Sequence, residues 1–341
     1  MLIQKPERNF EISEFLKSHG WDTSDERISI NWFSGDFSPR RYARLENTEN
    51  MKTAILMDAD KNQKTKEFIK ISNFLKVYDV HTPSIIAEKA DAGLVLMEDL
   101  GTQNIGILLD NGAKSLPFYI KSAELLAKLH NRLNDETEQN TLRTLDIPLF
   151  NKDMFLSQLD LFLDFYVPYI YKKELSEKQK EAFLSYWHNS LEYIDTLPKS
   201  ILLRDFMPDN LMLLIKNNAQ YTDISINIDD IGVIDFQDAG IGCIAYDISS
   251  LCEEVRRDGG FSLLPQVIDA YCAINKNINK LDMLKASYIL SAQRHTRILG
   301  ILAKLSHTDK IKFLPRVQNH LHNILQTDVL QDIQKAFANL P

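Results

Sequence analysis

The sequence predicts an α+β fold in which a small β-rich N-terminal lobe carries one main helix and a larger C-terminal lobe is mostly helical. Two observations predict it. Short strand-like runs separated by turn residues fill residues 1–98, whereas longer segments with apolar side chains at helical spacing fill residues 99–341. With 341 residues and 44% hydrophobic composition, the chain is long enough for two lobes with sizeable cores.

Within the N-terminal lobe, the first element is expected to be a short amphipathic helix over residues 7–19. A second, main helix is expected over residues 64–77, where apolar residues recur on one side. The polar cluster 47–50 predicts a hairpin turn. The expected strands are residues 28–33, 41–46, 53–58, 84–89 and 93–98.

The C-terminal lobe begins where Asp99-Leu100-Gly101 breaks the strand pattern. Pro168 lies inside one of the helical segments that follow and should kink or end its helix. The polar segment 216–230 separates two apolar strands and is expected to be a surface hairpin or loop. The expected helices are residues 117–133, 153–171, 177–197, 245–257, 263–273, 281–305 and 314–337, with a break possible in the last.

Composition argues against several classes of partner. A net charge of −8 disfavours a broad surface for nucleic acid or anionic membranes. The three cysteines, an odd number without CxxC spacing, are expected to be reduced thiols in a cytoplasmic protein. The first residues lack the apolar stretch of a signal peptide, and no run approaches the roughly 18 apolar residues of a membrane span. We therefore expect a cytoplasmic protein, most simply a monomer, with a small-molecule partner.

The chemistry is indicated by three polar residues. Asp205 follows the apolar run 201–203 and precedes Asn210 by five positions, and Asp235 ends a second apolar run 30 positions after Asp205. Phosphoryl transfer from ATP needs one carboxylate to orient a hydroxyl, and oxygen ligands to hold Mg²⁺ on the phosphates. An Asp and an Asn at this spacing are by themselves more often loop or N-cap residues. The strand–loop context and the second strand ending in Asp-Phe favour the phosphotransferase interpretation.

At these residues the chain resembles the aminoglycoside phosphotransferase and choline kinase superfamily, whose members share a protein-kinase-like bilobal fold. The resemblance is closest to bacterial sugar kinases of cell-wall recycling, which phosphorylate the anomeric hydroxyl of N-acetylmuramate and N-acetylglucosamine. It covers nearly the whole chain. The segments that carry it are residues 36–44, 203–212, 232–239 continuing to Tyr246-Asp247, and, more weakly, 294–300.

The resemblance implies a role for particular residues. Asp205 would be the catalytic base, and Asn210 and Asp235 would bind Mg²⁺. Arg204 and Asp247 would support the catalytic loop; Asp247 could equally be the N-cap of its helix. The residues expected to bind nucleotide are Ser34, Ser38, Arg40 and Arg41 in the phosphate loop, and Met97 and Asp99 beside the adenine. The residues expected to bind the acceptor are Asp238, Arg294 and Arg297.

Two departures from the superfamily pattern matter. Leu203 stands where many members have a His that braces the catalytic loop. The strand 53–58 carries Met57 where a kinase usually has the Lys that pairs with the α/β-phosphates. The cation that replaces it is expected among Arg40, Arg41 and Arg44, and the sequence does not decide which.

The acceptor is the least constrained part of the prediction. The mixed charges of the C-terminal helices do not suit a polycationic aminoglycoside, whereas Arg294 or Arg297 could pair with the lactyl carboxylate of N-acetylmuramate. Choline, ethanolamine or homoserine kinases of the superfamily are the alternative. A nucleotide-binding pseudokinase scaffold is a third reading, favoured by the missing Lys and opposed by the complete set Asp205, Asn210 and Asp235. Nucleotide preference and oligomeric state stay open.

Overall fold

The computed structural model describes residues 6–33, 40–59, 64–214 and 226–340, and its contacts divide the chain into two compact units. The first comprises the described residues of 1–104, 211–217 and 229–238, and the second comprises the remainder. The predicted lobe boundary lay after residue 98. The hairpin that leads to Asp235 belongs to the first unit, because its strands form hydrogen bonds with residues of the segment 1–104. Val233 N donates to His81 O at 2.8 Å, and Leu213 N donates to Gln103 O at 2.9 Å.

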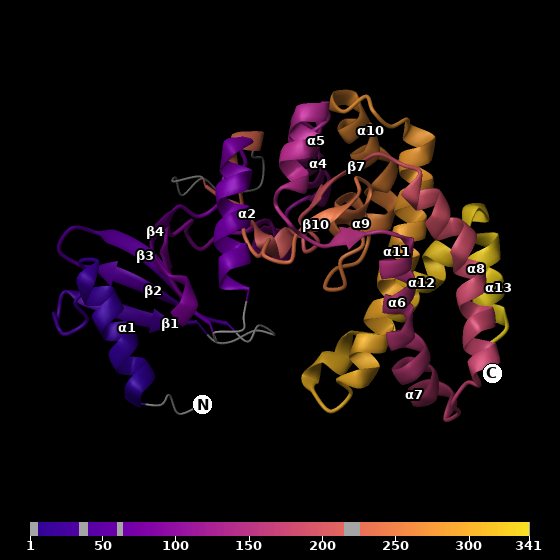
Figure 1. The fold of residues 1–341 in the computed structure, drawn as a ribbon, viewed down its shortest axis with the longest axis horizontal. Coiled ribbons are helices and arrows are strands. Elements are labelled where there is room, and N and C mark those ends of the chain that lie inside the picture. Colours follow the sequence, from indigo (N-terminus) through magenta and orange to yellow (C-terminus); the bar gives the residue numbers. More distant parts are fainter. Residues whose placement is uncertain (1–5, 34–39, 60–63, 215–225, 341) are drawn as a thin grey trace. The chain divides into compact units, whose positions relative to one another are not determined.

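The first unit is built on a five-stranded antiparallel sheet in the order β1-β2-β3-β5-β4, drawn in indigo and purple in Figure 1. Helix α1 packs on it through Ile12, Phe15 and Leu16, which join sheet residues in one buried cluster. The elements of the sheet and its helices are α1 (Pro6–Ser18), β1 (Ile28–Trp32), β2 (Arg41–Asn47), β3 (Lys52–Asp58), α2 (Thr65–Val77), β4 (Ile85–Lys89) and β5 (Leu94–Met97). A separate two-stranded hairpin joins β8 (Leu211–Leu213) to β9 (Ile231–Val233).

The predicted hairpin turn joins β2 and β3, and its tightness has a local cause. The side chain of Asn47 accepts hydrogen bonds from the backbone of Glu49 and Asn50 at 2.9 and 3.3 Å, and Met51 adopts a positive φ of 56°. This turn sets the β2–β3 register in which Arg41 lies opposite Asp58.

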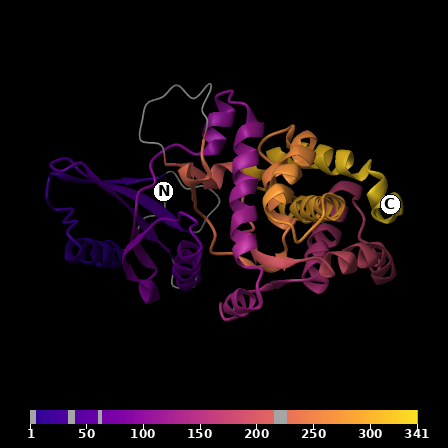
Figure 2. The ribbon, with the colours of Figure 1, turned by 90° about the horizontal axis from the view of Figure 1, so that it is seen from above.

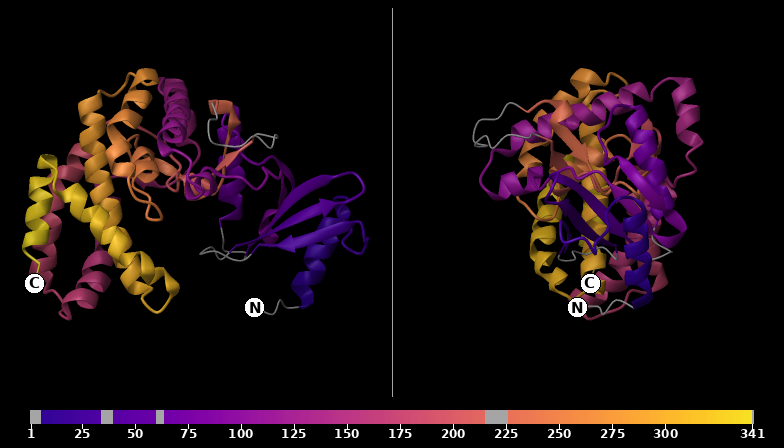
Figure 3. Two further views of the ribbon diagram at one scale, coloured as in Figure 1. Left: turned by 180° about the vertical axis from the view of Figure 1, so that it is seen from behind. Right: turned by 90° about the vertical axis from the view of Figure 1, so that its left-hand side faces the viewer.

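The second unit is mostly helical, and the 25-residue helix α11 (Lys280–Lys304) lies at its centre, as Figure 3 shows from behind. Fifteen of its residues are buried, because α6, α9, α10 and α12 all contact it. Helix α4 packs against α10 (Figure 2). The other helices are α3 (Ile105–Asp110), α4 (Ser115–Arg132), α5 (Glu136–Arg143), α6 (Lys152–Leu161), α7 (Val167–Tyr171), α8 (Glu177–Asp195), α9 (Tyr246–Cys252), α10 (Leu264–Ile274), α12 (Leu314–Leu325) and α13 (Gln331–Ala338).

Three strands complete the second unit: β6 (Leu149–Phe150), β7 (Lys199–Leu202) and β10 (Gly240–Cys243), in the order β6-β10-β7. The sequence predicts a kink or helix end at Pro168. The structure has a π-helical turn over Phe162–Tyr166, just before this proline. Proline lacks a backbone N–H, and the wider turn re-registers the hydrogen bonds ahead of it. In the described part of the chain, no helix is both long and apolar enough to cross a membrane.

Candidate active site

Asp205 lies on a sharply bent loop that follows β7. Arg204 adopts a left-handed φ of +67°, and Asp205 N donates to Leu203 O at 2.9 Å. Asn210 closes the short helical turn at the other end of the loop, and its Nδ2 donates to the backbone O of Asp205 at 2.8 Å. The predicted base and one predicted metal ligand are therefore joined directly, and the amide oxygen of Asn210 is the atom left to bind a cation.

Asp247, in α9, holds this loop by its backbone. Its Oδ2 accepts a hydrogen bond from Leu203 N at 2.7 Å, and its Oδ1 accepts one from Arg204 N at 2.9 Å. Ser250, one turn further along α9, donates to Arg204 O at 3.0 Å. Burial raises the pKa of Asp247 to about 7, although the two backbone hydrogen bonds act in the opposite direction. The left-handed conformation of Arg204 is thus fixed by three bonds from one helix.

His130, on α4, holds the strand that leads into the loop. Its Nε2 lies 2.9 Å from Ile201 O and its Nδ1 lies 2.7 Å from the hydroxyl of Tyr271. Burial lowers the pKa of His130 to about 4, so the ring is neutral and has one donor. Nε2 must be that donor because a carbonyl only accepts, and Nδ1 then accepts from Tyr271. The sequence alone indicates no role for His130, because a single histidine within the apolar stripe of a helix is usually a packed residue.

Arg257 clamps the far end of the loop that carries Asp205. Its Nη1 donates to Asp209 Oδ2 at 2.6 Å and to Glu254 Oε1 at 3.1 Å, and its Nε donates to Asp110 Oδ1 at 2.8 Å. A Cβ on Gly106 would lie 2.7 Å from Arg257 Nη2, so glycine is what lets α3 approach this ion pair. The sequence alone does not indicate this clamp, because Asp110 and Asp209 lie 147 and 48 positions from Arg257 along the chain.

Asp235 lies just beyond β9, in the first unit, with a left-handed φ of +61°. Its carboxylate is 42% exposed; Oδ1 accepts from Gln237 Nε2 at 2.8 Å and lies 3.5 Å from Arg40 Nη1. Phe236 turns the other way and stacks on Phe68 of α2, with ring centroids 4.9 Å apart. The buried ring anchors the segment, so the preceding carboxylate is held at the surface of the unit.

The three arginines offered for the missing Lys have different partners. Arg41 pairs with Asp58, the residue opposite it in the β2–β3 register. Arg44 faces the other way, with its Nε 2.8 Å from Asp99 Oδ2. Arg40 is buried, and it is the one whose guanidinium lies beside Asp235. Among the three, only Arg40 is adjacent to a predicted metal ligand.

The remaining nucleotide residues stay predictions. Ser34 and Ser38 lie outside the described residues. Met97 is buried at the end of β5, where it pairs with Ile55 and Ile85. The carboxylate of Asp99 pairs with Arg44 and accepts a hydrogen bond from Gly101 N at 2.9 Å. The groups of this segment that an adenine could contact are therefore those of the backbone.

The residues predicted for the acceptor differ in their surroundings. Arg294 is 4% exposed and its Nη1 donates to Glu253 O at 2.9 Å, so its guanidinium holds the end of α9. Arg297, one turn on in α11, is half-buried, and this burial lowers the pKa of its guanidinium group. The Asp205 carboxylate is one of the charges that act on it. Asp238 pairs with Lys64 at the start of α2. Arg297 is therefore the predicted acceptor residue whose environment includes the predicted base.

Solved structures show the same fold. A choline/ethanolamine kinase family protein from Mesorhizobium loti superposes with a TM-score of 0.63 at 12% identity, covering 96% of this chain and 98% of its own. The ADP-bound aminoglycoside phosphotransferase APH(2'')-Ib superposes with a TM-score of 0.61 at 13% identity, covering 98% and 99%. The predicted α+β, protein-kinase-like fold is thus confirmed.

Sequence relatives define the class of protein. N-acetylmuramate/N-acetylglucosamine kinase of Pseudomonas aeruginosa is 26% identical over 352 aligned positions, which cover 97% of this chain and 94% of that protein. The fold and these relatives identify a small-molecule kinase. Residues 29–284 match the model of the phosphotransferase enzyme family, and the chain belongs to that family.

Proposed function

We propose that the chain transfers the γ-phosphoryl group of ATP to the anomeric hydroxyl of N-acetylmuramate or N-acetylglucosamine, as a step in the recycling of cell-wall sugars. The observation that carries the proposal is the loop of Asp205, which is held by hydrogen bonds with Asp247 and Asn210. This loop lies in a chain that aligns over 97% of its length with an N-acetylmuramate/N-acetylglucosamine kinase. The structural relatives at 12–13% identity support the fold alone.

The proposed chemistry assigns one role to each side chain. Asp205 accepts a hydrogen bond from the anomeric hydroxyl, and takes its proton as the new O–P bond forms and the bond to the departing ADP breaks. Asn210 and Asp235 fit Mg²⁺, because an amide oxygen and a half-exposed carboxylate are the hard ligands that this ion prefers. When bound, Mg²⁺ supplies charge neutralisation on the phosphates. Arg40 takes over the task of the missing strand Lys, and Arg297 contacts the acceptor.

The fixed backbone of the loop supports this assignment. A general base must stay within about 3 Å of the proton it abstracts, and a displacement of about 1 Å can cost 100-fold in rate. The carboxylate of Asp247 and the hydroxyl of Ser250 hold the residue before Asp205, and Asn210 holds Asp205 itself. Buried hydrogen bonds thus position the proposed base in a chain that has Leu203 where many members of the superfamily have a bracing His.

The substrate test is turnover over a panel of acceptors. We expect ADP release with N-acetylmuramate or N-acetylglucosamine and none with their 1-O-methyl glycosides, which lack the anomeric hydroxyl. Turnover of choline, ethanolamine or an aminoglycoside in place of the sugars would establish another small-alcohol kinase of this fold. Mg²⁺-dependent nucleotide binding without turnover of any acceptor would show a scaffold and refute the proposal.

The catalytic test is Asp205→Asn, which keeps the size of the side chain and removes the base. We expect kcat to fall by roughly 10³-fold, within the range for a lost general base, while ADP affinity is retained. Asp332→Asn is the matched control, because Asp332 is exposed on α13 and pairs there with Lys335. If Asp205→Asn keeps kcat within a factor of ten of the control, Asp205 is not the base.

A further inference from the structure

Three buried side chains from three elements meet in the second unit, and none belongs to the proposed catalytic set. Glu253 follows the last residue of α9, His295 lies in α11 and His320 lies in α12. One carboxylate oxygen and one nitrogen of each ring all lie within 4.8 Å of one another. The exposed fractions of the side chains are 2%, 0% and 10%. Buried groups of this kind need partners, because an isolated buried carboxylate is costly.

The separations are close to those of ligands around one ion. Glu253 Oε2 lies 3.0 Å from His295 Nε2 and 3.7 Å from His320 Nδ1. Two ligands of a tetrahedral ion, each about 2.05 Å from it, stand about 3.3 Å apart. The two measured separations lie on either side of that value, so small side-chain rotations suffice to coordinate a metal.

Asp258 determines which nitrogen of His320 is available. Its Oδ1 lies 3.0 Å from His320 Nε2, and a carboxylate can only accept, so Nε2 carries the hydrogen. Nδ1 then presents its lone pair toward the Glu253 carboxylate. Among the described residues, this buried Nδ1 has no hydrogen-bond partner, and neither has Nδ1 of His295. A carboxylate that orients a metal-binding His through its other nitrogen is the usual outer partner of such ligands.

We propose that Glu253, His295 and His320 bind a divalent transition-metal ion, with Zn²⁺ the best match. Two imidazoles and one carboxylate form a donor set that suits Zn²⁺ and does not suit Mg²⁺ or Ca²⁺, which take oxygen ligands. The neighbouring cations are directed elsewhere: Arg294 donates to the backbone O of Glu253, and Arg316 pairs with Asp258. The two carboxylates, Glu253 and Asp258, balance the charge of the ion.

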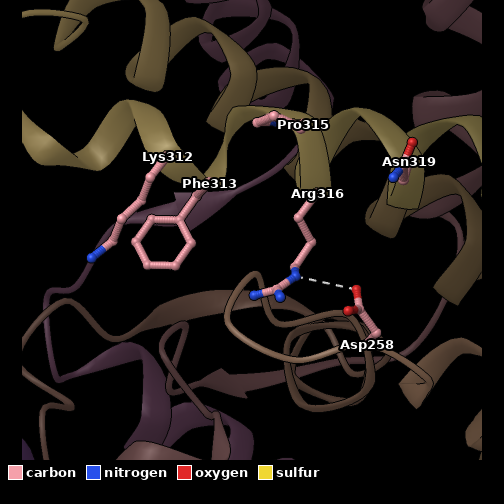
Figure 4. Close-up of a pocket in the computed structure, with 6 residues that line it drawn as sticks. All are labelled: Asp258, Lys312, Phe313, Pro315, Arg316 and Asn319. Carbon is pink, nitrogen blue, oxygen red and sulfur yellow. Dashed lines mark ion pairs between the residues drawn. The ribbon is translucent and has the colours of Figure 1, made fainter.

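Asp258 links the buried cluster to the surface of the unit, because its Oδ1 lies 3.0 Å from His320 Nε2. Asp258 lines an open pocket of about 520 Å³, where Figure 4 shows Arg316 reaching toward it and Lys312 on the other side. Asp258 itself is 68% exposed, so the outer partner of the site faces solvent. The three ligands are much less exposed than Asp258, at 2%, 0% and 10%.

The ion would fix the segment that supports the catalytic loop. Glu253 begins the turn that carries Arg256 and Arg257; Arg256 Nη1 lies 3.0 Å from Met207 Sδ, and Arg257 pairs with Asp209. Binding of Zn²⁺ would tie this turn to α11 and α12. The proposed site is therefore structural, and it is separate from the magnesium of the phosphoryl-transfer step.

The test uses the full chain with any affinity tag removed, stripped with a chelator, incubated with Zn²⁺ and desalted. We expect about one Zn²⁺ per chain by elemental analysis, and a visible absorption band of a four- or five-coordinate ion when Co²⁺ is used instead. His320→Ala should lose both, with circular dichroism confirming that it is folded. His322→Ala is the matched control, because His322 is exposed on the same helix, and it should behave as wild type. Failure of the wild-type chain to retain metal would show a hydrogen-bonded cluster only and overturn the proposal.

A second variant keeps the proposal testable if His320→Ala unfolds. Asp258→Asn alters an exposed residue that is not a ligand, and the loss of an outer carboxylate typically weakens metal affinity about 10–100-fold. Competition with a chromophoric chelator measures this affinity directly. A hydrogen-bonded cluster with a protonated His320 is the competing explanation, although 3.7 Å is too long for a hydrogen bond to Glu253. Unchanged Zn²⁺ affinity in Asp258→Asn would contradict the proposed ligand geometry.

Discussion

We expect Asp247 to make the stability of the second unit depend on pH, and Asp247→Asn tests this. Burial raises the pKa of this carboxyl group from 3.8 to about 7. A group with a higher pKa in the folded state binds its proton more tightly when folded, so unfolding releases the proton and stability falls as pH rises through this range. The loss begins near the unfolded pKa of 3.8 and is complete above about pH 7. Asparagine does not titrate, and the variant lacks this contribution.

The magnitude follows from the two pKa values. Between pH 5 and pH 7, the difference in proton binding between the folded and unfolded states costs the wild-type chain about 2 kcal/mol of unfolding free energy. Asp247→Asn carries a separate cost that does not depend on pH. Its amide nitrogen must face the backbone N–H of Leu203 or Arg204, and an unsatisfied buried donor costs about 1–3 kcal/mol. The variant should therefore be less stable than the wild-type chain at pH 5. The difference in unfolding free energy between the two proteins should be smaller by about 2 kcal/mol at pH 7.

Urea unfolding of both proteins at the two pH values, followed by circular dichroism, measures this difference. Asp332→Asn, which removes an exposed carboxylate from α13, should show no such decrease. Because the charge of Asp205 helps to raise the pKa of Asp247, the decrease should be smaller in an Asp205→Asn background. A difference between wild type and Asp247→Asn that stays constant within about 0.5 kcal/mol would mean that the buried carboxyl group is already ionised at pH 5, and the argument would fail.

Three further predictions concern the nucleotide, the acceptor and the clamp. Arg40→Ala should weaken ATP affinity at least tenfold. Arg41→Ala should change ATP affinity less than threefold, because Arg41 pairs with Asp58 within the sheet. Equal effects of the two variants in calorimetric titrations would contradict the assignment of phosphate binding to Arg40. Arg297→Ala should raise KM for the sugar more than KM for ATP, and the opposite split in steady-state kinetics would place Arg297 on the nucleotide. Gly106→Ala should destabilise the chain by about 1–3 kcal/mol, because its Cβ meets Arg257, and an unchanged urea midpoint would contradict this.

Much of the fold follows from local patterns in the sequence. The expected strands 41–46 and 53–58 are β2 and β3, and the expected helix 281–305 is α11, because each has a strong periodic pattern and clear turn residues at its ends. The helix expected over 245–257 ends five residues early, at Cys252. Glu253 is buried there against His295 and His320 from distant segments, which the local pattern does not reveal. Short elements such as α3 have too few residues to show a period.

The residues of the candidate site fall into two groups, those that the sequence predicts and those that only the fold reveals. Asp205, Asn210 and Asp235 follow from residue type and spacing, because phosphoryl transfer needs few kinds of group. The residues that hold the loop of Asp205 could not be predicted from spacing. His130 and Arg257 act through hydrogen bonds to groups 71 and 48 positions away along the chain. A single sequence without the fold gives no sign that such residues meet.

The arginine that replaces the missing strand Lys can be argued from what each candidate would leave behind. If Arg41 turned to phosphate, the buried Asp58 would lose one of the two cationic partners that it has among the described residues, Arg8 and Arg41. Breaking a buried ion pair by removing one partner is costly. Arg40 has Asp235 as its partner, which is half-exposed and is itself the proposed magnesium ligand. A nucleotide with its metal would supply an anion to Arg40 and a cation to Asp235 together, so neither charge would be left unpaired, and for this reason we assign the phosphate-binding role to Arg40.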